Sequence, residues 1–335
     1  YLHAAAMVKA GIYLMLLFSP AFAGTLVWQT ILISAGLITA VIGAIFAMRR
    51  FDLKEIMAYS TVSQLGLIVA LIGVGTPGAL ATAALYTLAH AMFKASLFMV
   101  VGIVDHQAGT RDIRLLHGLW RKMPVTLITT LLAGLSMAGV FPMLGFISKE
   151  YLLGHMLDVG ESAWVGFALT AITVFASTFT FAYTGRILFG AFSSYRGTNR
   201  EFEGDEQHAQ KDVVKEAKPL FVVSALTPAL LGLIFGPAIA VLYPLIGAAG
   251  SSAAGESYTA KYALFGGFTA ELALSITIIA LGTLAISQRR RLDTFFERRY
   301  LKFTALDVVE AIRTGAISLG ARVGNPTRTD APAQH

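Results

Sequence analysis

Apolar residues form long runs without a charged side chain along most of this sequence. No Asp, Glu, Lys or Arg occurs within residues 10–48, 56–93, 123–148, 162–185 or 219–255. Because about 20 helical residues cross the hydrocarbon core of a bilayer, a charge-free run of this length predicts one membrane-spanning helix, and a run of twice the length predicts two. No long strand-like alternation of apolar and polar residues is present. The pattern therefore predicts an all-α, polytopic transmembrane bundle.

Eight spans are expected from this pattern. They cover residues 1–19, 27–48, 56–74, 80–104, 124–157, 163–191, 219–247 and 264–288. Because Tyr1 already stands inside an apolar stretch, we expect the chain to be part of a longer protein.

The connections between these spans alternate in charge. Lys and Arg gather in the second, fourth, sixth and eighth connections, at 49–54, 105–122, 186–218 and from 289 onward, and are nearly absent from the others. Short loops rich in Lys and Arg stay on the cytoplasmic side of a membrane. We therefore expect a multi-pass protein of the cell membrane, embedded in the lipid bilayer with its basic loops in the cytoplasm.

The fifth span is too long for a simple crossing. Gly139, Pro142 and Gly145 interrupt it near its middle. Proline removes a backbone donor, and backbone groups released in this way are tolerated in a membrane only where protein or water satisfies them. The segment predicts either a helix broken at an ion or substrate site or a simple proline kink.

Composition narrows the chemistry. The chain is 56% hydrophobic and 14% charged, has a mean hydropathy of +0.67, and contains no cysteine, which excludes disulfides and thiolate-held clusters. It shows no glycine-rich phosphate loop and no metal-ligand spacing, so we expect no cofactor and no metal. The net charge of +6 lies in the loops and is no sign of nucleic-acid binding.

Three lysines stand inside apolar spans: Lys9, Lys94 and Lys149. A lysine at the centre of a membrane helix costs about 2.5–3.5 kcal/mol on insertion scales and is a functional candidate by default. Lys9 could instead snorkel to the membrane edge, and Lys149 could lie at a helix end. Lys94 has charge-free sequence on both sides, which makes it the strongest of the three candidates.

Tyr86, His90 and Lys94 follow each other at intervals of four and predict one stripe along a helix. Such a row of phenol, imidazole and amine can pass a proton along, since histidine titrates near neutral pH and buried lysine loses its proton more readily. A satisfied core histidine is the plainer alternative for His90. His3 is a weaker relay candidate in the first span.

Glu150 directly follows Lys149 and has three open roles: a helix cap, a charge partner of Lys149, or an ion ligand. The polar group Ser60, Thr61, Ser63 and Gln64 near the start of the third span predicts either helix-to-helix hydrogen bonds or a water-lined path. Glu271 is isolated in the last span and receives no role.

Three stretches resemble a known family. These are FDLKEIMAYSTVSQLGLIVALIGVG at 51–75, LAHAMFKASLFMVVGIVDH at 88–106 and SMAGVFPMLGFISKE at 136–150. They are similar to signatures of the antiporter-like membrane subunits shared by respiratory complex I and the Mrp-type multisubunit Na⁺/H⁺ antiporters. The stretches at 3–14 and 102–119 look most like the A subunit of the Mrp type.

The resemblance implies a proton relay that includes Lys94, His90 and Lys149, with Lys9 and His3 at matching positions. It implies that 1–191 is the second helical repeat of the core, with its broken helix at about 124–157. A charged cytoplasmic loop would follow at 192–218, two further transmembrane helices at 219–288, an amphipathic lateral helix at 289–323 and a disordered tail at 324–335. Phe141 and Tyr86 depart from the pattern of many relatives, which have proline and histidine there.

The function that this resemblance implies is a transporter subunit rather than an enzyme in its own right. It would move protons in a complex that exchanges Na⁺ or another monovalent cation for protons, with other membrane subunits as partners. The alternative is a proton-pumping subunit of complex I or of a membrane-bound hydrogenase. The third hypothesis is that the protein is a purely structural membrane scaffold.

Overall fold

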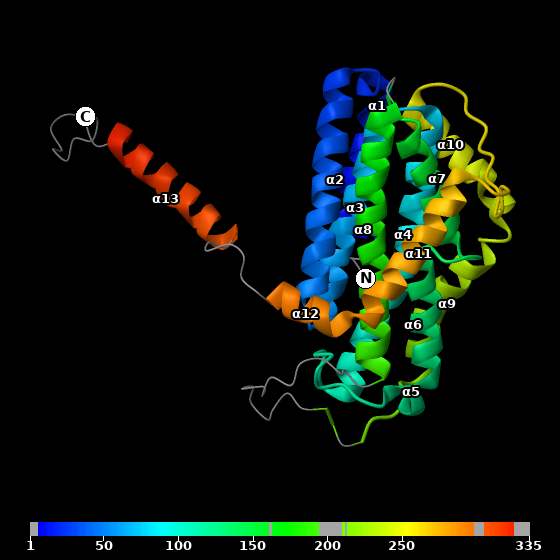
Figure 1. The fold of residues 1–335 in the computed structure, drawn as a ribbon, viewed down its shortest axis with the longest axis vertical. Helices are drawn as coiled ribbons and strands as arrows, with labels where there is room; N and C mark the ends of the chain where they lie inside the picture. The colour runs from blue at the N-terminus through cyan, green and yellow to red at the C-terminus, as the bar shows by residue number, and fades with distance from the viewer. Residues whose placement is uncertain (1–5, 161–162, 194–209, 212, 298–304, 325–335) are drawn as a thin grey trace. The chain divides into compact units, whose positions relative to one another are not determined.

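The chain is described by a computed structural model covering residues 6–160, 163–193, 210–211, 213–297 and 305–324. The regular elements of the described residues are helices, and an isolated bridge pairs Asp52 with Asp112. Five helices are long and apolar enough to cross a membrane, and a bent helix pair and shorter apolar helices accompany them. The prediction of an all-α polytopic membrane bundle is confirmed (Figure 1).

The helices follow one another as η2 (Met7–Lys9), α1 (Ala10–Phe22), α2 (Leu26–Arg49), α3 (Leu53–Val74), α4 (Pro77–Ala108), α5 (Leu119–Lys122), α6 (Pro124–Ala138), α7 (Leu144–Leu157), α8 (Ala163–Phe192), α9 (Pro219–Ile234), η4 (Ile239–Leu242), α10 (Tyr243–Ala254), α11 (Ala270–Ser287), α12 (Arg289–Glu297) and α13 (Ala305–Gly324). Residues 1–293 form one compact unit and residues 294–335 another. In the stretch expected to hold one lateral helix, α12 and α13 are separate elements, and the tail from residue 325 lies outside the described residues.

Local sequence explains where the central helices begin and end. Thr76 accepts a hydrogen bond from Ala79 N at 3.3 Å and caps α4, whose first residue is Pro77. Gly109 ends α4 in the left-handed conformation, at φ +79°. A polar cap, proline in the first turn and glycine after the last turn are the usual helix boundary signals.

Small residues let α2 and α3 pack with their backbones in contact. A Cβ atom on Gly36 would lie 2.5 Å from Ala70 N, and one on Gly66 would lie 2.6 Å from Ala40 N. Ser63 adds a hydrogen bond across the pair, from its hydroxyl to Ala40 O at 2.8 Å. Membrane helices associate through such close backbone approach, because lipid provides no hydrophobic drive for helix pairing.

The span expected at 219–247 is not one straight helix. It runs as α9 and then η4 with α10, bent by 101°. Pro237 stands at the bend and lacks a backbone donor. A Cβ atom on Gly236 would lie 1.9 Å from Pro142 O, so this bend packs against the interruption between α6 and α7. The bundle therefore contains two interrupted apolar segments that touch, where the sequence pattern predicted one.

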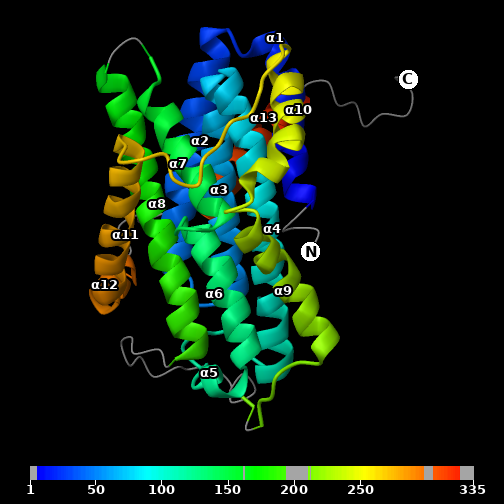
Figure 2. The same cartoon turned by 90° about the vertical axis from the view of Figure 1, so that its right-hand side faces the viewer.

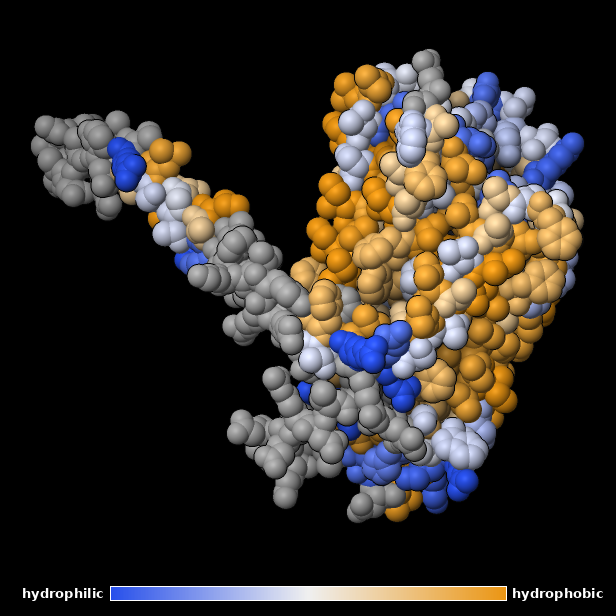
Figure 3. All heavy atoms as spheres, viewed as in Figure 1, coloured by the Kyte–Doolittle hydropathy of each residue, from blue (hydrophilic) through white to orange (hydrophobic). Residues whose placement is uncertain are grey.

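The basic loops meet at one end of the bundle. Leu53 N donates to Arg111 O at 3.0 Å, and Gly118 N donates to Ser193 O at 2.9 Å, which joins three of these connections. Hydrophilic side chains gather at this end, where α5 lies, and hydrophobic side chains cover the flanks (Figure 3). Among the large apolar side chains, Leu220, Trp164 and Leu26 are 81%, 79% and 77% exposed, as expected where a helix faces lipid.

Candidate functional site

Helix α4 carries the stripe expected from the sequence and lies in the middle of the bundle. It packs against α3, α6, α7, α9 and α10. Tyr86, His90 and Lys94 are all 0% exposed. Four-residue spacing keeps the three on one face of the helix, because 3.6 residues complete a turn. The ionisable groups are therefore inside protein rather than directed at lipid or headgroups.

Neutral oxygens of α3 hold the Lys94 ammonium. Its Nζ donates to Met57 O at 3.3 Å and also to the Ser60 hydroxyl. Among the described residues no carboxylate pairs with it. A buried charge held only by dipoles is costly, so this ammonium is an exception among buried groups that needs an explanation.

The His90 imidazole lies one turn before Lys94 on α4. Neither ring nitrogen has a hydrogen-bond partner among the described residues, and Phe93 covers the ring edge-on at 5.3 Å between centroids. The alternative considered for His90, a core histidine with its nitrogens hydrogen-bonded to protein, is not seen among the described residues.

Tyr86 belongs to a hydrogen-bond network that joins three helices. Its hydroxyl donates to Gln64 Oε1 at 2.5 Å, and Gln64 Nε2 reaches the Tyr183 hydroxyl at 3.2 Å. Tyr183 donates in turn to Thr180 at 3.0 Å. Sequence reasoning placed Gln64 in a polar stretch but missed Tyr183 and Thr180 of α8. A repeating pattern of Thr and Tyr along the inner face of α8 is the signal that could have found them.

Lys149 lies at the interruption of the fifth expected span. α6 ends at Ala138 and α7 begins at Leu144, and Lys149 Nζ donates to Ala138 O at 3.3 Å. Its side chain is 4% exposed. The end of a helix carries a partial negative charge on its unsatisfied carbonyls, so the ammonium is stabilised there without a carboxylate.

The glycines of the interruption are needed for close contact. Gly139 has φ +77°, and a Cβ atom there would lie 2.6 Å from Lys149 Cδ. A Cβ atom on Gly145 would lie 1.9 Å from Ser136 O. The first turn of α7 therefore packs directly against the last turn of α6, and only glycine fits at position 145. The first glycine makes room for the lysine, and the second fixes the distance between the two half-helices.

Lys9 is 8% exposed at the end of η2. Lys9, His90, Lys94 and Lys149 are all buried inside the described part of the bundle. The structure therefore brings together four of the residues singled out in the sequence. His3 lies outside the described residues.

The stripe on α4 continues one turn further, to Thr82. The Thr82 hydroxyl lies 3.1 Å from His155 Nε2 of α7 and 3.2 Å from the Tyr262 hydroxyl. Thr82 precedes Tyr86 by four residues, a spacing that was visible in the sequence. It links the stripe to α7 and to the segment before α11, at the end of the bundle away from the basic loops.

Glu150 is 6% exposed and, among the described residues, forms no ion pair with Lys149. Met143 is the N-cap residue of α7, and no side chain forms a capping hydrogen bond there. Of the three roles considered for Glu150, capping and pairing with Lys149 are therefore not seen.

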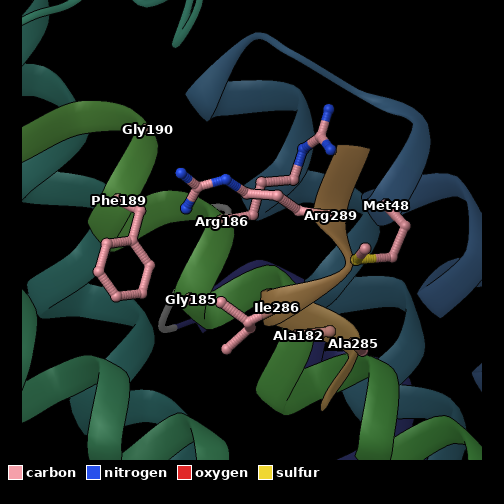
Figure 4. Close-up of a pocket in the computed structure, with 9 residues that line it drawn as sticks. All are labelled: Met48, Ala182, Gly185, Arg186, Phe189, Gly190, Ala285, Ile286 and Arg289. Atoms are coloured by element: carbon pink, nitrogen blue, oxygen red, sulfur yellow. The ribbon is translucent and has the colours of Figure 1, made fainter. Parts of the chain in front are cut away.

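An apolar pocket lies elsewhere, between α2, α8 and α11, near the basic end (Figure 4). Arg186 and Arg289 line one side of it, with Met48, Phe189 and Ile286 among the apolar groups. Its volume of about 20 Å³ is close to what one water molecule requires. None of Lys9, His90, Lys94 and Lys149 lines it. The described residues hold no cluster of three or more metal-ligating groups.

Comparison with known proteins agrees with this arrangement. The chain is 38% identical over 307 residues to the A subunit of the Na⁺/H⁺ antiporter of Bacillus subtilis, covering 85% of this chain and 37% of that protein. It is 43% identical over 192 residues to the probable A/B subunit of a K⁺/H⁺ antiporter of Rhizobium meliloti, covering 57% of this chain and 19% of that protein. The chain thus spans well under half the length of these relatives.

Among solved structures, a chain of the Mrp complex from a Dietzia species matches with a TM-score of 0.87 and 48% identity, over 100% of this chain and 35% of that one. An archaeal membrane-bound sulfane sulfur reductase shares the fold, with a TM-score of 0.63 over 76% of this chain and 48% of that one, at 24% identity. The family model for the transmembrane part of NADH:quinone oxidoreductase and Mrp antiporters matches residues 1–180. The protein therefore belongs to the NADH:quinone oxidoreductase/Mrp antiporter transmembrane family.

Proposed function

We propose that this protein is a proton-translocating membrane subunit of a multisubunit antiporter that exchanges protons for a monovalent cation. The observation that carries the proposal is the state of Lys94. Its ammonium is completely buried, held by two neutral oxygens, and has no carboxylate partner among the described residues. An intramembrane charge arranged in this way contributes little to stability and is suited to releasing and regaining a proton.

Protons would move between sites that repel each other. A proton on Lys94 disfavours a proton on Lys149 or Lys9, because like charges within one low-dielectric region interact strongly. Arrival of a proton at one lysine therefore promotes its departure from the next. His90, one helical turn from Lys94, is the neutral group that can accept and pass on the proton between them.

The redox-driven alternative uses the same relay, so the relay residues do not distinguish it. The two relatives named above are antiporter subunits of the Na⁺/H⁺ and K⁺/H⁺ types, which supports an antiporter and leaves the cation as a monovalent one. Other membrane subunits would be its partners. The basic end would face the cytoplasm, residues 1–191 would be the second helical repeat, and the membrane would be the cell membrane.

The test replaces Lys94 by methionine in the full-length subunit within its complex. Methionine keeps the length of the side chain, and replacing an unpaired buried charge by an apolar group is not expected to prevent folding. Proton movement driven by added Na⁺ or K⁺ is followed in inverted vesicles by a pH-sensitive dye. The exposed Lys54 at the basic end, replaced by methionine, is the matched control.

We expect the Lys94→Met complex to assemble in normal amount and to lose cation-driven proton movement. Lys54→Met should retain it. Normal exchange by an assembled Lys94→Met complex would refute the relay and would favour a structural role for this chain.

A further inference from the structure

A pocket outside the relay opens beside α7 and the start of α11. Its volume is about 240 Å³, and its lining residues are Glu150, Tyr151, Ala263, Gly266, Thr269 and Glu271. The segment between α10 and α11 crosses α7 before it enters α11 (Figure 2). Two parts of the chain that are distant in sequence, α7 and the segment that leads into α11, therefore form this pocket.

Two carboxylates face this space. Glu150 comes from α7 and Glu271 from the first turn of α11. A Cβ atom on Gly154 would lie 3.1 Å from Glu271 Oε1, so the Glu271 carboxylate rests against α7. Gly154 follows Glu150 by four residues and shares its face of the helix. The absence of a side chain at Gly154 allows the second carboxylate to approach the first.

Glu150 is an acid with an unsatisfied oxygen. The residue is 94% buried (6% exposed), and its Oε2 atom has no hydrogen-bond partner among the described residues. Neither Glu150 nor Glu271 pairs with a lysine or arginine of the described part of the chain. Buried carboxylate oxygens are nearly always hydrogen-bonded or bound to a cation, since an isolated one is costly.

The remaining polar groups of the pocket are also oxygens. The Tyr151 hydroxyl accepts a hydrogen bond from Ala263 N at 3.0 Å, which ties the crossing segment to α7. The Thr269 hydroxyl accepts from Leu272 N at 3.3 Å, at the start of α11. Oxygen-only surroundings select hard cations over the softer transition metals.

We propose that this pocket is a binding site for an alkali cation, held between the carboxylates of Glu150 and Glu271. The described residues contain no third acidic group at the site, which leaves a divalent ion with fewer carboxylates than its dedicated protein sites usually offer. The volume leaves room for the ion to keep several water molecules. Cation binding at this pocket does not depend on the proposed function. Only a role of the bound cation in transport rests on it, since Glu150 directly follows Lys149.

The test measures binding of radioactive sodium, with rubidium as the potassium analogue, to the purified full complex at equilibrium. The variants are Glu150→Gln and Glu271→Gln, which keep side-chain shape and remove the charge. Glu256→Gln is the matched control, because Glu256 is exposed in the same segment between α10 and α11. Thermal unfolding of each complex shows whether it is folded, and Glu271, which is only half-buried, supplies a variant that folds if Glu150→Gln does not.

We expect Glu150→Gln and Glu271→Gln each to bind one ion fewer per complex, or to bind it with at least tenfold lower affinity, and Glu256→Gln to match the unmodified complex. Unchanged number and affinity in a folded Glu271→Gln complex would overturn the site. Lys94→Met separates the two proposals. It should abolish proton movement and leave the number and affinity of bound alkali cations unchanged. The relay proposal and the cation-site proposal can therefore fail independently.

Discussion

Gly139 offers the sharpest test of the geometry around Lys149. The residue has φ +77°, a conformation that costs an L-amino acid roughly 1–2 kcal/mol. The added methyl group of Gly139→Ala would also lie 2.6 Å from Lys149 Cδ. Since carbon atoms prefer separations of roughly 3.5–4.0 Å, the lysine side chain must retreat by about 1 Å.

That retreat has a second effect. The bond from Lys149 Nζ to Ala138 O is already 3.3 Å long, near the upper end of the hydrogen-bond range. Losing a hydrogen bond to a charged group costs about 1.5–3 kcal/mol. Misplacing a transfer group by 1 Å can slow a reaction by about 10²-fold. We therefore expect Gly139→Ala to lower the unfolding temperature of the complex and to slow proton movement by up to about that factor.

The measurement combines dye-detected proton movement in vesicles with thermal unfolding of the purified complex. Gly102→Ala is the control, because Gly102 lies within α4 and a Cβ atom there would meet nothing within 4 Å. In a helix interior that change stabilises by roughly 0.5–1 kcal/mol. If Gly139→Ala exchanged ions at the normal rate and unfolded at the normal temperature, the argument that Lys149 needs this glycine would be wrong.

Other substitutions test separate contacts. Ser60→Ala should lower the unfolding temperature more than Ser63→Ala. Ser60 accepts a hydrogen bond from the buried Lys94 ammonium, whereas Ser63 donates to a backbone carbonyl of α2, and charged hydrogen bonds are worth about twice neutral ones. Equal losses of unfolding temperature would contradict this. Asp52 accepts from Lys54 N at 2.7 Å and caps α3, so Asp52→Ala should cost about 1 kcal/mol of unfolding free energy, and Asp52→Ser, which retains a cap, should cost less. Gln64→Leu should destabilise the complex by roughly 1–3 kcal/mol, because the buried Tyr86 hydroxyl loses its partner while Tyr183 keeps its bond to Thr180. Gln29→Leu, whose amide reaches only Ala23 O at 3.5 Å, should have little effect in the same unfolding assay.

The sequence alone predicted the class of protein and most of the helices. Charge-free runs of this length have few stable forms other than membrane helices, because lipid requires backbone groups to be satisfied within each segment. Lys94 and His90 were visible for the same reason, since an ionisable group in an apolar run is conspicuous. The interruption near Pro142 was visible because proline cannot donate a hydrogen bond.

What the sequence could not predict depends on neighbours from other helices. Pro237 marks the bend after Ile234 locally, but no local pattern reveals that the bend packs against Pro142 through Gly236. Tyr183 and Thr180 join the network only because α8 packs beside α3. Glu271 looked isolated and without a role, and only the crossing of the segment before α11 brings it to the pocket that Glu150 lines. Burial and hydropathy along one helix are local properties of the chain, whereas the pairing of polar groups across helices is decided by packing.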